Sequence, residues 1–214
     1  MSGDSVRVAQ PLFPVEGQGS IPMSPLQFEI KIINVPLAIN LNKLWHSRLP
    51  IIKSSNIFRN THNISFGAIY KNCYFAVGIW TSPVARLLNG LNYLELRRLA
   101  ISNDAPKNTA SRMIKIMTIL IKKQMPEIVK LISYQDTEVH AGIIYKASGW
   151  SINGYTKNIG IGWNNRRRNK MQTTSDKIRW EKQIRPEPDP AQKLINQVTE
   201  ELKQMPIQQQ LHWS

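Results

Sequence analysis

Apolar and polar positions follow two different periods in the first third of the chain. Residues 27–33 alternate apolar and polar side chains, which predicts a half-buried strand. Residues 34–45 place their leucines on one helical face behind Asn34, a residue type that favours the helix N-cap, and so predict an amphipathic helix. Two β-rich runs, 65–70 and 73–80, predict a hairpin, because the asparagine between them tolerates the positive φ of a two-residue turn.

The middle of the chain predicts strands and helices in direct succession. The expected elements are a strand, a turn, a helix, a strand, a short helix and a last strand, over residues 93–101, 102–108, 109 onward, 128–134, 138–148 and 150–156. Gly149 suits the end of the short helix, because glycine readily adopts a left-handed backbone. This order is typical of the cofactor cleft of acyl-CoA-type transferases. We therefore expect an α/β (α+β) core with a central mixed sheet flanked by helices.

Composition divides the chain into three parts. Residues 1–26 are rich in Pro, Gly, Ser and Gln and lack a period, so we expect a flexible N-terminal arm. Residues 27–162 contain the predicted elements of an acyltransferase-like catalytic domain. Residues 163–214 are a basic C-terminal extension with an amphipathic helix over 191–205. We expect that helix either to pack on the core or to form the contact of a homodimer.

Charge narrows the choice of partner. The 214 residues include 28 Lys and Arg against 14 Asp and Glu, a formal net charge of +14. Such an excess attracts phosphate chains, and its clustering favours a nucleic-acid partner over a basic protein with no such role. The single Cys73 excludes an internal disulfide and a multi-cysteine zinc site, and we expect it to be buried. No run is apolar enough to span a membrane and no signal peptide is evident, so we expect a cytoplasmic protein.

The turn before the helix at Thr109 is a candidate phosphate site. A helix N-terminus presents unpaired N–H groups and a partial positive charge, and small residues there let a ligand approach the backbone. Thr109, Ala110 and Ser111 are small, and Lys107 adds positive charge. The structural alternative is an ordinary helix start that Asn108 or Thr109 caps.

Three side chains are candidates for proton transfer. Tyr145 lies on the short helix, where it can donate its phenolic proton to a leaving group or simply pack in the core. Asp136 follows the second strand, where it can act on an amine or cap the next helix. His46 follows the first helix and is a candidate base, although a lone histidine is more often structural. His46 and Asp136 are also candidate metal ligands, with His140 as a third.

Arginines occur in two settings. Arg97 and Arg98 lie within an otherwise apolar strand, and alternation predicts that they point to opposite faces, one of them into the cleft. A buried guanidinium needs a phosphate or carboxylate partner. The basic stretch interleaves cations with Trp163 and Trp180, which suits phosphate contacts and base stacking, or else forms a solvated tail. The candidate nucleic-acid-binding residues are Arg166, Arg167, Arg168, Lys170, Lys177 and Arg179.

These residues together resemble a known family. Segment 93–149 resembles the core of GCN5-related N-acetyltransferases, and residues 27–182 resemble the Mom-type phage DNA-modification proteins. The motifs that carry the second resemblance are Trp45-His46-Ser47 with Pro50, the strand Leu94–Leu99, the loop Asn108–Ser111, and Tyr134-Gln135-Asp136 followed by Gly142, Tyr145 and Gly149-Trp150. The resemblance implies an enzyme that adds a carbamoylmethyl (acetamido) group to N6 of adenine in phage DNA, which hides restriction sites from host nucleases.

The resemblance also implies the members of the site. By match, the catalytic residues are His46, Asp136 and Tyr145, and the donor-binding residues are Arg98, Asn108, Thr109, Ala110 and Ser111. It further implies double-stranded DNA as partner, a place in the host cytoplasm, and acetyl-CoA or another acyl or glycyl donor, with iron as a candidate metal. The general acetyltransferase pattern has Gly-x-Gly or Gly-x-Ala in the cofactor loop. This chain has no glycine there, so the identity of the donor stays open.

We therefore expect an acetyltransferase-like enzyme that acts on a flipped adenine. Asp136, together with His46, accepts the proton of the amine in this hypothesis, and Tyr145 protonates the leaving group. Two alternatives stay open. One is a conventional acetyl-CoA-dependent N-acetyltransferase of a protein or small amine. The other is a non-catalytic DNA-binding protein on a degenerate transferase fold, which the missing glycines would permit.

Overall fold

A computed structural model describes residues 21–46, 52–88, 91–157, 175–187 and 199. The chain divides into a unit that ends at Ile184 and a second unit from Arg185 onward, and the first contains every element named below. Residues 1–20 of the predicted arm lie outside the described residues, and the rest leads into a short 3-10 helix, η1 (Pro25–Gln27). The predicted terminal helix also lies outside them, apart from Thr199. No helix in the described part of the chain has the length and apolar character of a membrane span.

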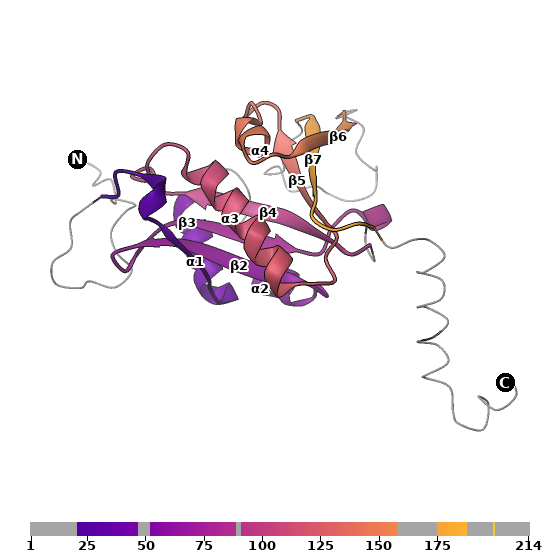
Figure 1. The fold of residues 1–214 in the computed structure, drawn as a ribbon, viewed down its shortest axis with the longest axis horizontal. Helices are drawn as coiled ribbons and strands as arrows, with labels where there is room; N and C mark the ends of the chain where they lie inside the picture. The colour runs from indigo at the N-terminus through magenta and orange to yellow at the C-terminus, as the bar shows by residue number, and fades with distance from the viewer. Residues whose placement is uncertain (1–20, 47–51, 89–90, 158–174, 188–198, 200–214) are drawn as a thin grey trace, which may run out of the picture. The chain divides into compact units, whose positions relative to one another are not determined.

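Seven strands form one sheet in the order β1-β2-β3-β4-β5-β7-β6 (Figure 1). Their bounds are β1 Glu29–Ile32, β2 Asn63–Tyr70, β3 Cys73–Thr81, β4 Tyr93–Ile101, β5 Lys130–Asp136, β6 Ser151–Thr156 and β7 Lys177–Gln183. Neighbouring strands are antiparallel except β4 and β5, which are parallel. The predicted central mixed sheet is confirmed, and all strands but β7 lie where the hydrophobic pattern predicts them.

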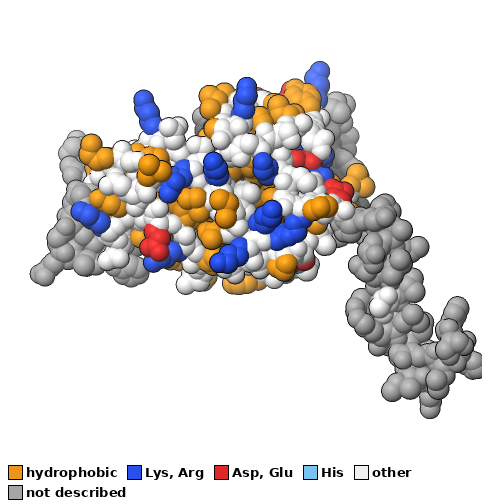
Figure 2. All heavy atoms as spheres, viewed as in Figure 1, with side chains coloured by type: hydrophobic (Ala, Val, Ile, Leu, Met, Phe, Trp, Pro, Cys, Tyr) orange, Lys and Arg blue, Asp and Glu red, His pale blue; other side chains and the backbone are white. Residues whose placement is uncertain are grey.

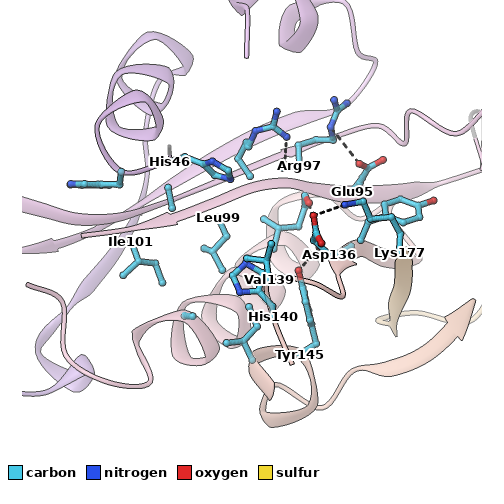
Figure 3. A pocket seen from close by; sticks show the side chains of 18 residues that line it. His46, Glu95, Arg97, Leu99, Ile101, Asp136, Val139, His140, Tyr145 and Lys177 are labelled. Carbon is cyan, nitrogen blue, oxygen red and sulfur yellow. Dashed lines mark hydrogen bonds and ion pairs between the residues drawn. The ribbon is translucent and has the colours of Figure 1, made fainter. Parts of the chain in front are cut away.

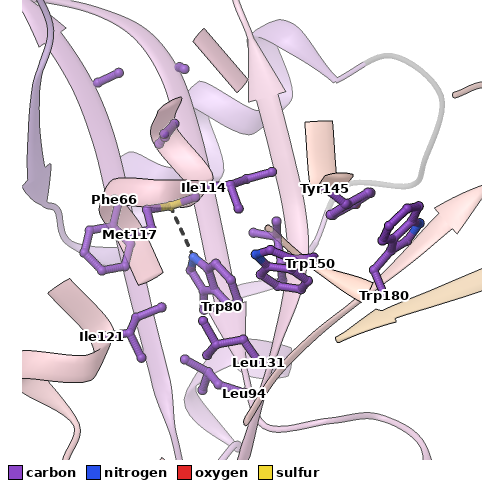
Figure 4. Packing of buried hydrophobic residues seen from close by; sticks show 14 of the residues in the cluster. Phe66, Trp80, Leu94, Ile114, Met117, Ile121, Leu131, Tyr145, Trp150 and Trp180 are labelled. Atoms are coloured by element: carbon purple, nitrogen blue, oxygen red, sulfur yellow. Dashed lines mark hydrogen bonds between the residues drawn. The ribbon is translucent and has the colours of Figure 1, made fainter. Parts of the chain in front are cut away.

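Helices cover both faces of this sheet. Their bounds are α1 Val35–Trp45, α2 Ser54–Phe58, α3 Thr109–Gln124 and α4 Ile143–Ala147, with a 3-10 turn, η2, at Arg86–Leu88. One face, here called the α3 face, packs Phe66 and Trp80 against α3 and α4. Figure 4 shows this cluster, in which the indole N–H of Trp80 donates to the sulfur of Met117. The other face, the α1 face, packs Val77 and Ile79 against α1 and α2. Each face therefore has its own hydrophobic core.

Local sequence signals explain where several elements begin. Asn34 is the N-cap of α1, and its side chain accepts a hydrogen bond from the backbone N–H of Leu37 at 2.9 Å. In the β2–β3 turn, Lys71 and Asn72 have φ values of 45° and 65°, the left-handed region that such a hairpin turn requires. Both features are as the sequence predicts, because each depends on residues only a few positions apart.

Two elements differ from the prediction. α4 begins only at Ile143, because the chain first turns back onto the carbonyl of Asp136 and enters the helix after Gly142, whose φ is 72°. The predicted basic extension contains a strand, β7, which lies between β5 and β6. The core therefore continues past the predicted boundary at residue 162, as far as Ile184.

A β-bulge in β4 decides which way its arginines point. Leu96 and Arg98 pair with consecutive residues of β3, so Arg97 is an extra residue between them. Directly paired residues share a face of the sheet, so Arg98 lies on the α1 face with its partner Ile79. Arg97 contacts the carboxylate of Glu95 at 3.4 Å on the same face. The prediction that the two arginines point to opposite faces is wrong, because the bulge interrupts the alternation.

Candidate active site

A gap opens in the middle of the sheet between β4 and β5. The two strands pair only over Tyr93–Leu96 and Lys130–Ser133. Beyond this point β4 stays with β3 and β5 stays with β7, and a cavity of about 570 Å³ lies between them (Figure 3). The end of α1, the first turn of α3, α4 and the start of β7 complete its walls. The cavity is therefore lined from both faces of the sheet.

On the α3 face the cavity meets the predicted donor loop. Ala110 lines the cavity, and Asn108 is the N-cap of α3 with a φ of 67° and no side-chain capping hydrogen bond. This left-handed conformation is the one glycine supplies, and asparagine is among the few other residues that adopt it readily. The hydroxyls of Thr109 and Ser111 donate to backbone carbonyls at 2.7 and 3.1 Å, and neither residue lines the cavity. Asn108 therefore gives the loop the left-handed backbone conformation that a glycine would supply, although the loop contains no glycine.

Tyr145 closes the same side of the cavity. It is 8% exposed, its ring stacks on Trp180 with centroids 5.5 Å apart, and its hydroxyl forms a hydrogen bond with Ser133 Oγ at 2.9 Å. Burial raises the pKa of the Tyr145 hydroxyl, and the bond with Ser133 only partly offsets this. The group therefore keeps its proton at neutral pH and can donate it. Ser148 lies between α4 and the donor loop: its Oγ is 2.7 Å from the carbonyl oxygen of Ile144 and 3.0 Å from that of Ser111, and either carbonyl can accept its single proton.

On the α1 face, His46 and Arg98 lie near each other. His46 is the C-cap of α1, and Figure 3 shows it on the opposite side of β4 from Leu99 and Ile101. Burial, and next the charge of Arg98, lower the pKa of His46, so its imidazole is neutral near pH 7. Arg98 donates from Nη1 to the carbonyl of Arg97 at 2.7 Å. The sequence analysis grouped Arg98 with the donor loop, whereas the bulge puts it on the face opposite to α3.

Glu95 is a cavity residue that the sequence analysis did not single out. It is 7% exposed and lines the cavity on the α1 face. Its Oε2 accepts a hydrogen bond from the N–H of Val84 at 3.0 Å, and its Oε1 faces the guanidinium of Arg97 at 3.4 Å. Burial raises the pKa of Glu95, and these donors only partly offset it. The sequence signal that points to it is a single carboxylate within a strand of apolar residues and arginines.

Asp136 has a different environment at the end of β5. It pairs across the ladder with Lys177 of β7, and its Oδ2 lies 2.8 Å from the ammonium of Lys177. Burial acts to raise the pKa of Asp136, but hydrogen bonds from Lys177, Ser175 and the backbone N–H of Glu138 outweigh it, so the pKa is lowered. An ionised carboxylate that a cation already engages is a better hydrogen-bond acceptor than a base.

The described residues do not fit the iron that the resemblance implies. Asp136 is engaged by an ammonium, and His46 lies beside the positive charge of Arg98. Both cations repel a metal ion. In the part of the chain that the structure describes, no group of three or more His, Cys, Asp or Glu side chains is placed to hold a metal. His140 lines the same cavity, but the predicted set of three ligands is not assembled.

The predicted nucleic-acid-binding residues fall into two groups. Lys177 and Arg179 lie on β7, where Lys177 lines the cavity and Arg179 pairs with Glu181 at 2.8 Å. The others lie outside the described residues, in the segment that joins β6 to β7: Arg166, Arg167, Arg168 and Lys170. Because Thr156 of β6 is paired with Lys177, both ends of that segment leave the sheet beside the cavity.

Solved N-acetyltransferases share this fold at low sequence identity. The ribosomal-protein-S18-alanine N-acetyltransferase from Escherichia coli has a TM-score of 0.53 at 14% identity, over 76% of this chain and 97% of that chain. An acetyltransferase from Bacillus subtilis in complex with CoA has a TM-score of 0.51 at 10% identity, over 73% of this chain and 99% of that chain. An N-acetyltransferase from Staphylococcus aureus Mu50 has a TM-score of 0.52 at 16% identity, over 73% of this chain and 97% of that chain. The expected GCN5-related N-acetyltransferase-like fold is confirmed.

No curated protein matches the chain. The family model described as the Mom protein family matches residues 59–207, which is more than half of the chain and includes β2 to β7. The matched stretch contains Arg98, the donor loop, Asp136 and Tyr145, whereas His46 precedes it. The chain belongs to the Mom protein family.

Proposed function

We propose that this protein is a phage DNA-modification enzyme. It adds a carbamoylmethyl (acetamido) group to N6 of adenine in DNA and so protects that DNA from host restriction. The observation that carries the proposal is the cavity between β4 and β5, with the predicted donor loop and Tyr145 on one face of the sheet and Glu95 and His46 on the other. The N-acetyltransferase fold supports group transfer, and membership of the Mom family supports DNA as the acceptor.

Surface charge supports a polyanionic partner. The chain carries a net charge of +14, and three of its cations, Arg97, Arg98 and Lys177, line the cavity. Figure 2 shows further Lys and Arg side chains over the side of the molecule that α3 covers, with few Asp and Glu among them. Contacts between such cations and phosphates release counterions, which favours binding to DNA at low salt.

The donor lies against the α3 face in this proposal. Direct acetyl transfer from acetyl-CoA would leave an N6-acetyl group, so the donor in this proposal is an activated glycyl ester or thioester, whose glycyl group is an isomer of carbamoylmethyl. N6 displaces the leaving group at the carbonyl carbon of the donor, and a rearrangement then joins N6 to the methylene carbon and the amine nitrogen to the carbonyl carbon. The N-terminus of α3 offers backbone N–H groups and a partial positive charge to its phosphates, and Asn108 holds the preceding turn in the left-handed conformation. Ala110 is small enough to let the donor approach the backbone. The similar acetyltransferase from Bacillus subtilis is in complex with CoA, which supports a donor of this class.

The acceptor amine enters from the α1 face. N6 loses a proton as it bonds to the transferred group, and Glu95 is placed to accept this proton because burial raises the pKa of its carboxyl group. Neutral His46 is a second acceptor on the same wall. Asp136 orients the amine by accepting a hydrogen bond, because Lys177 holds its carboxylate ionised. Tyr145, on the other face, gives its proton to the leaving group.

The target base must leave the duplex to reach this cavity. N6 of adenine takes part in base pairing. A base that stays stacked in the duplex cannot enter the cavity, because strands and helices form its walls. Flipping the base costs roughly a few kcal/mol in lost pairing and stacking. Cations near the cavity, with the basic residues of the β6–β7 segment, can offset this cost through phosphate contacts.

Mass spectrometry of nucleosides from plasmid DNA tests the proposal. DNA from cells that express the wild type should contain carbamoylmethyl adenine, and DNA from cells that express Tyr145→Phe should contain far less. Lys115→Ala is the matched control, because Lys115 is exposed and does not line the cavity, so this variant should modify DNA like the wild type. Unmodified adenine beside soluble, folded wild-type protein would contradict the proposal.

A conventional acetyl-CoA-dependent N-acetyltransferase is the second candidate. The fold shared with three acetyltransferases supports it. This function predicts acetyl transfer to a peptide or small amine and no adduct on DNA. Incubation of the purified protein with acetyl-CoA and a mixture of amines, followed by mass spectrometry, distinguishes the two. A protein that binds DNA and no donor would instead be non-catalytic.

A further inference from the structure

The α1 face of the cavity carries more charged side chains than are needed to accept one proton from an amine. Among the described residues, three cations and two carboxylates line the cavity. Asp136 and Lys177 form one ion pair, and Glu95 and Arg97 form another. Arg98 is the third cation, so the charged residues of this cavity sum to a net positive charge.

The direction of Arg98 separates it from the donor. Arg98 pairs with Ile79, which packs with α1, whereas the next residue, Leu99, packs with the cluster of α3. Its side chain therefore leaves β4 on the face opposite to Asn108 and the N-terminus of α3. It extends toward His46 at the end of α1. An arginine in this position meets the acceptor and not the phosphates of a donor bound at α3.

We propose that Arg98 binds the DNA phosphate next to the flipped adenine, and so acts in acceptor recognition instead of donor binding. This rests on the proposed function, because it takes a nucleotide of DNA as the acceptor. A flipped nucleotide keeps the phosphates on both of its sides, which stay at the mouth of the cavity while the base enters it. A guanidinium suits a phosphate because its planar N–H groups donate to two oxygens at once.

The neighbours of Arg98 favour an anion at this place. The carboxylate of Glu95 is already engaged by Arg97 and by the N–H of Val84. Burial, and next the charge of Arg97, lower the pKa of Arg98, and the attraction of Glu95, which the two guanidinium groups share, offsets this only in part. A phosphodiester brings one negative charge to these groups and offsets their repulsion.

The test separates acceptor binding from donor binding. The acceptor probe is an oligothymidine strand with a single adenine, made in two forms. In one form both linkages beside the adenine are phosphodiesters, and in the other they are uncharged methylphosphonates. Fluorescence anisotropy measures the binding of each strand to the full chain, and calorimetry measures the binding of CoA. The variants are Arg98→Ala, Arg98→Lys and, as a control with the same change in charge as the first, Lys115→Ala.

The expected result is a loss of discrimination between the two strands. The wild type and Lys115→Ala should bind the phosphodiester strand roughly tenfold more tightly than the methylphosphonate strand, the scale of one charge-assisted hydrogen bond. Arg98→Ala should lose most of this difference while its affinity for CoA is unchanged. Arg98→Lys should recover part of it, because lysine keeps the charge but not the planar pair of donors.

Two results would overturn the proposal. One is Arg98→Ala losing affinity for CoA while it keeps the full difference between the strands, which would return Arg98 to the donor site. The other is equal binding of both strands by the wild type. Thermal unfolding identifies a variant that does not fold, and Arg98→Lys then carries the comparison. Intact discrimination between the strands, with no adenine adduct in cells, would sink the proposed function and leave Arg98 as a phosphate-binding residue.

Discussion

The two walls of the cavity differ in their chemistry. The α3 wall is mostly aliphatic, with the buried hydroxyl of Tyr145, the imidazole of His140 and the small side chain of Ala110 beside a helix N-terminus. The α1 wall carries a histidine, ion pairs and the guanidinium of Arg98. An apolar wall suits a long donor whose phosphates lie at its edge, whereas a charged wall suits a polar acceptor that must lose a proton. The difference teaches that one cavity can present a mostly aliphatic wall and a charged wall when its residues come from opposite faces of one sheet.

One inserted residue produces this separation. Without the bulge at Arg97, alternation would turn Arg98 toward α3 and Leu99 toward α1. The guanidinium of Arg98 would then lie on the α3 wall, and the aliphatic side chain of Leu99 would lie on the α1 wall. The bulge therefore lets one strand present Glu95, Arg97 and Arg98 together on the α1 face.

The largest effect is expected from Tyr145→Phe, which removes only a hydroxyl from the α3 wall. Adduct formation should fall roughly 10²- to 10⁴-fold if this group protonates the leaving group. The stacking on Trp180 stays, so the midpoint of thermal unfolding should change little. Nucleoside mass spectrometry and an unfolding curve measure the two quantities. A yield close to wild type would mean that the α3 wall only packs and carries no acid.

Glu95→Gln tests the α1 wall and should have the next largest effect. Burial raises the pKa of Glu95 above its ordinary value, so the ionised base is lost as the pH falls through this raised pKa. The wild-type rate should therefore decline toward acidic pH, whereas Glu95→Gln should be slow throughout and lack this decline. Adduct formation on added DNA in lysates buffered at different pH values measures both.

Asp136→Asn is the matched control for that experiment. The lowered pKa of Asp136 keeps it ionised through the same pH range, so its removal should lower the rate but leave the acidic decline in place. A decline that persists in Glu95→Gln and disappears in Asp136→Asn would instead assign proton transfer to Asp136.

Gly142→Ala disturbs the joint where α4 meets the sheet. Gly142 has a φ of 72°, and a Cβ there would contact Gln135 Oε1 and lie 2.7 Å from Trp180 Cζ2. Strain and overlap together should lower the free energy of unfolding by about 1–3 kcal/mol. In Gly149→Ala the φ is similar, at 74°, but the added Cβ meets only Lys182 Nζ, at 3.3 Å. Denaturant unfolding should show the smaller loss for Gly149→Ala, and equal losses would mean that φ alone decides.

The smallest effect is expected at the donor loop. Asn108→Gly keeps access to the left-handed φ and should bind CoA much as the wild type does. Asn108→Ala disfavours that conformation by about 1 kcal/mol, so the free loop should relax out of it and CoA binding should weaken about fivefold. Calorimetry measures both affinities. Equal affinities in all three proteins would mean that the turn does not shape the donor site.

Much of the fold was predictable because it depends on local signals. The cap at Asn34, the hairpin turn at Asn72 and the helix start at Thr109 each depend on neighbours a few residues away. β7 was missed because its alternating side chains include many charges and read as a basic stretch. Its pairing with β5 on one side and β6 on the other makes it a strand of the core.

The candidate site was predictable in its members more than in their roles. His46, Arg98, Ala110, Asp136 and Tyr145 come from five separate elements or their ends, and all line one cavity. Sequence reasoning missed the buried carboxylate of Glu95, and it named Lys177 as a nucleic-acid contact without finding its ion pair with Asp136. Both effects arise from burial and from contacts across strands, which no local pattern contains.

The sequence by itself determined the order of strands and helices, the positive charge and several of the side chains that meet in the cavity. Hydrophobic period, caps and turn residues act over a few positions, so they can be read along the chain. The tertiary structure alone decided the face on which Arg98 lies and the different environments of Glu95 and Asp136. Register, bulges and burial depend on partners far away in sequence, and these set the direction and the protonation of each group.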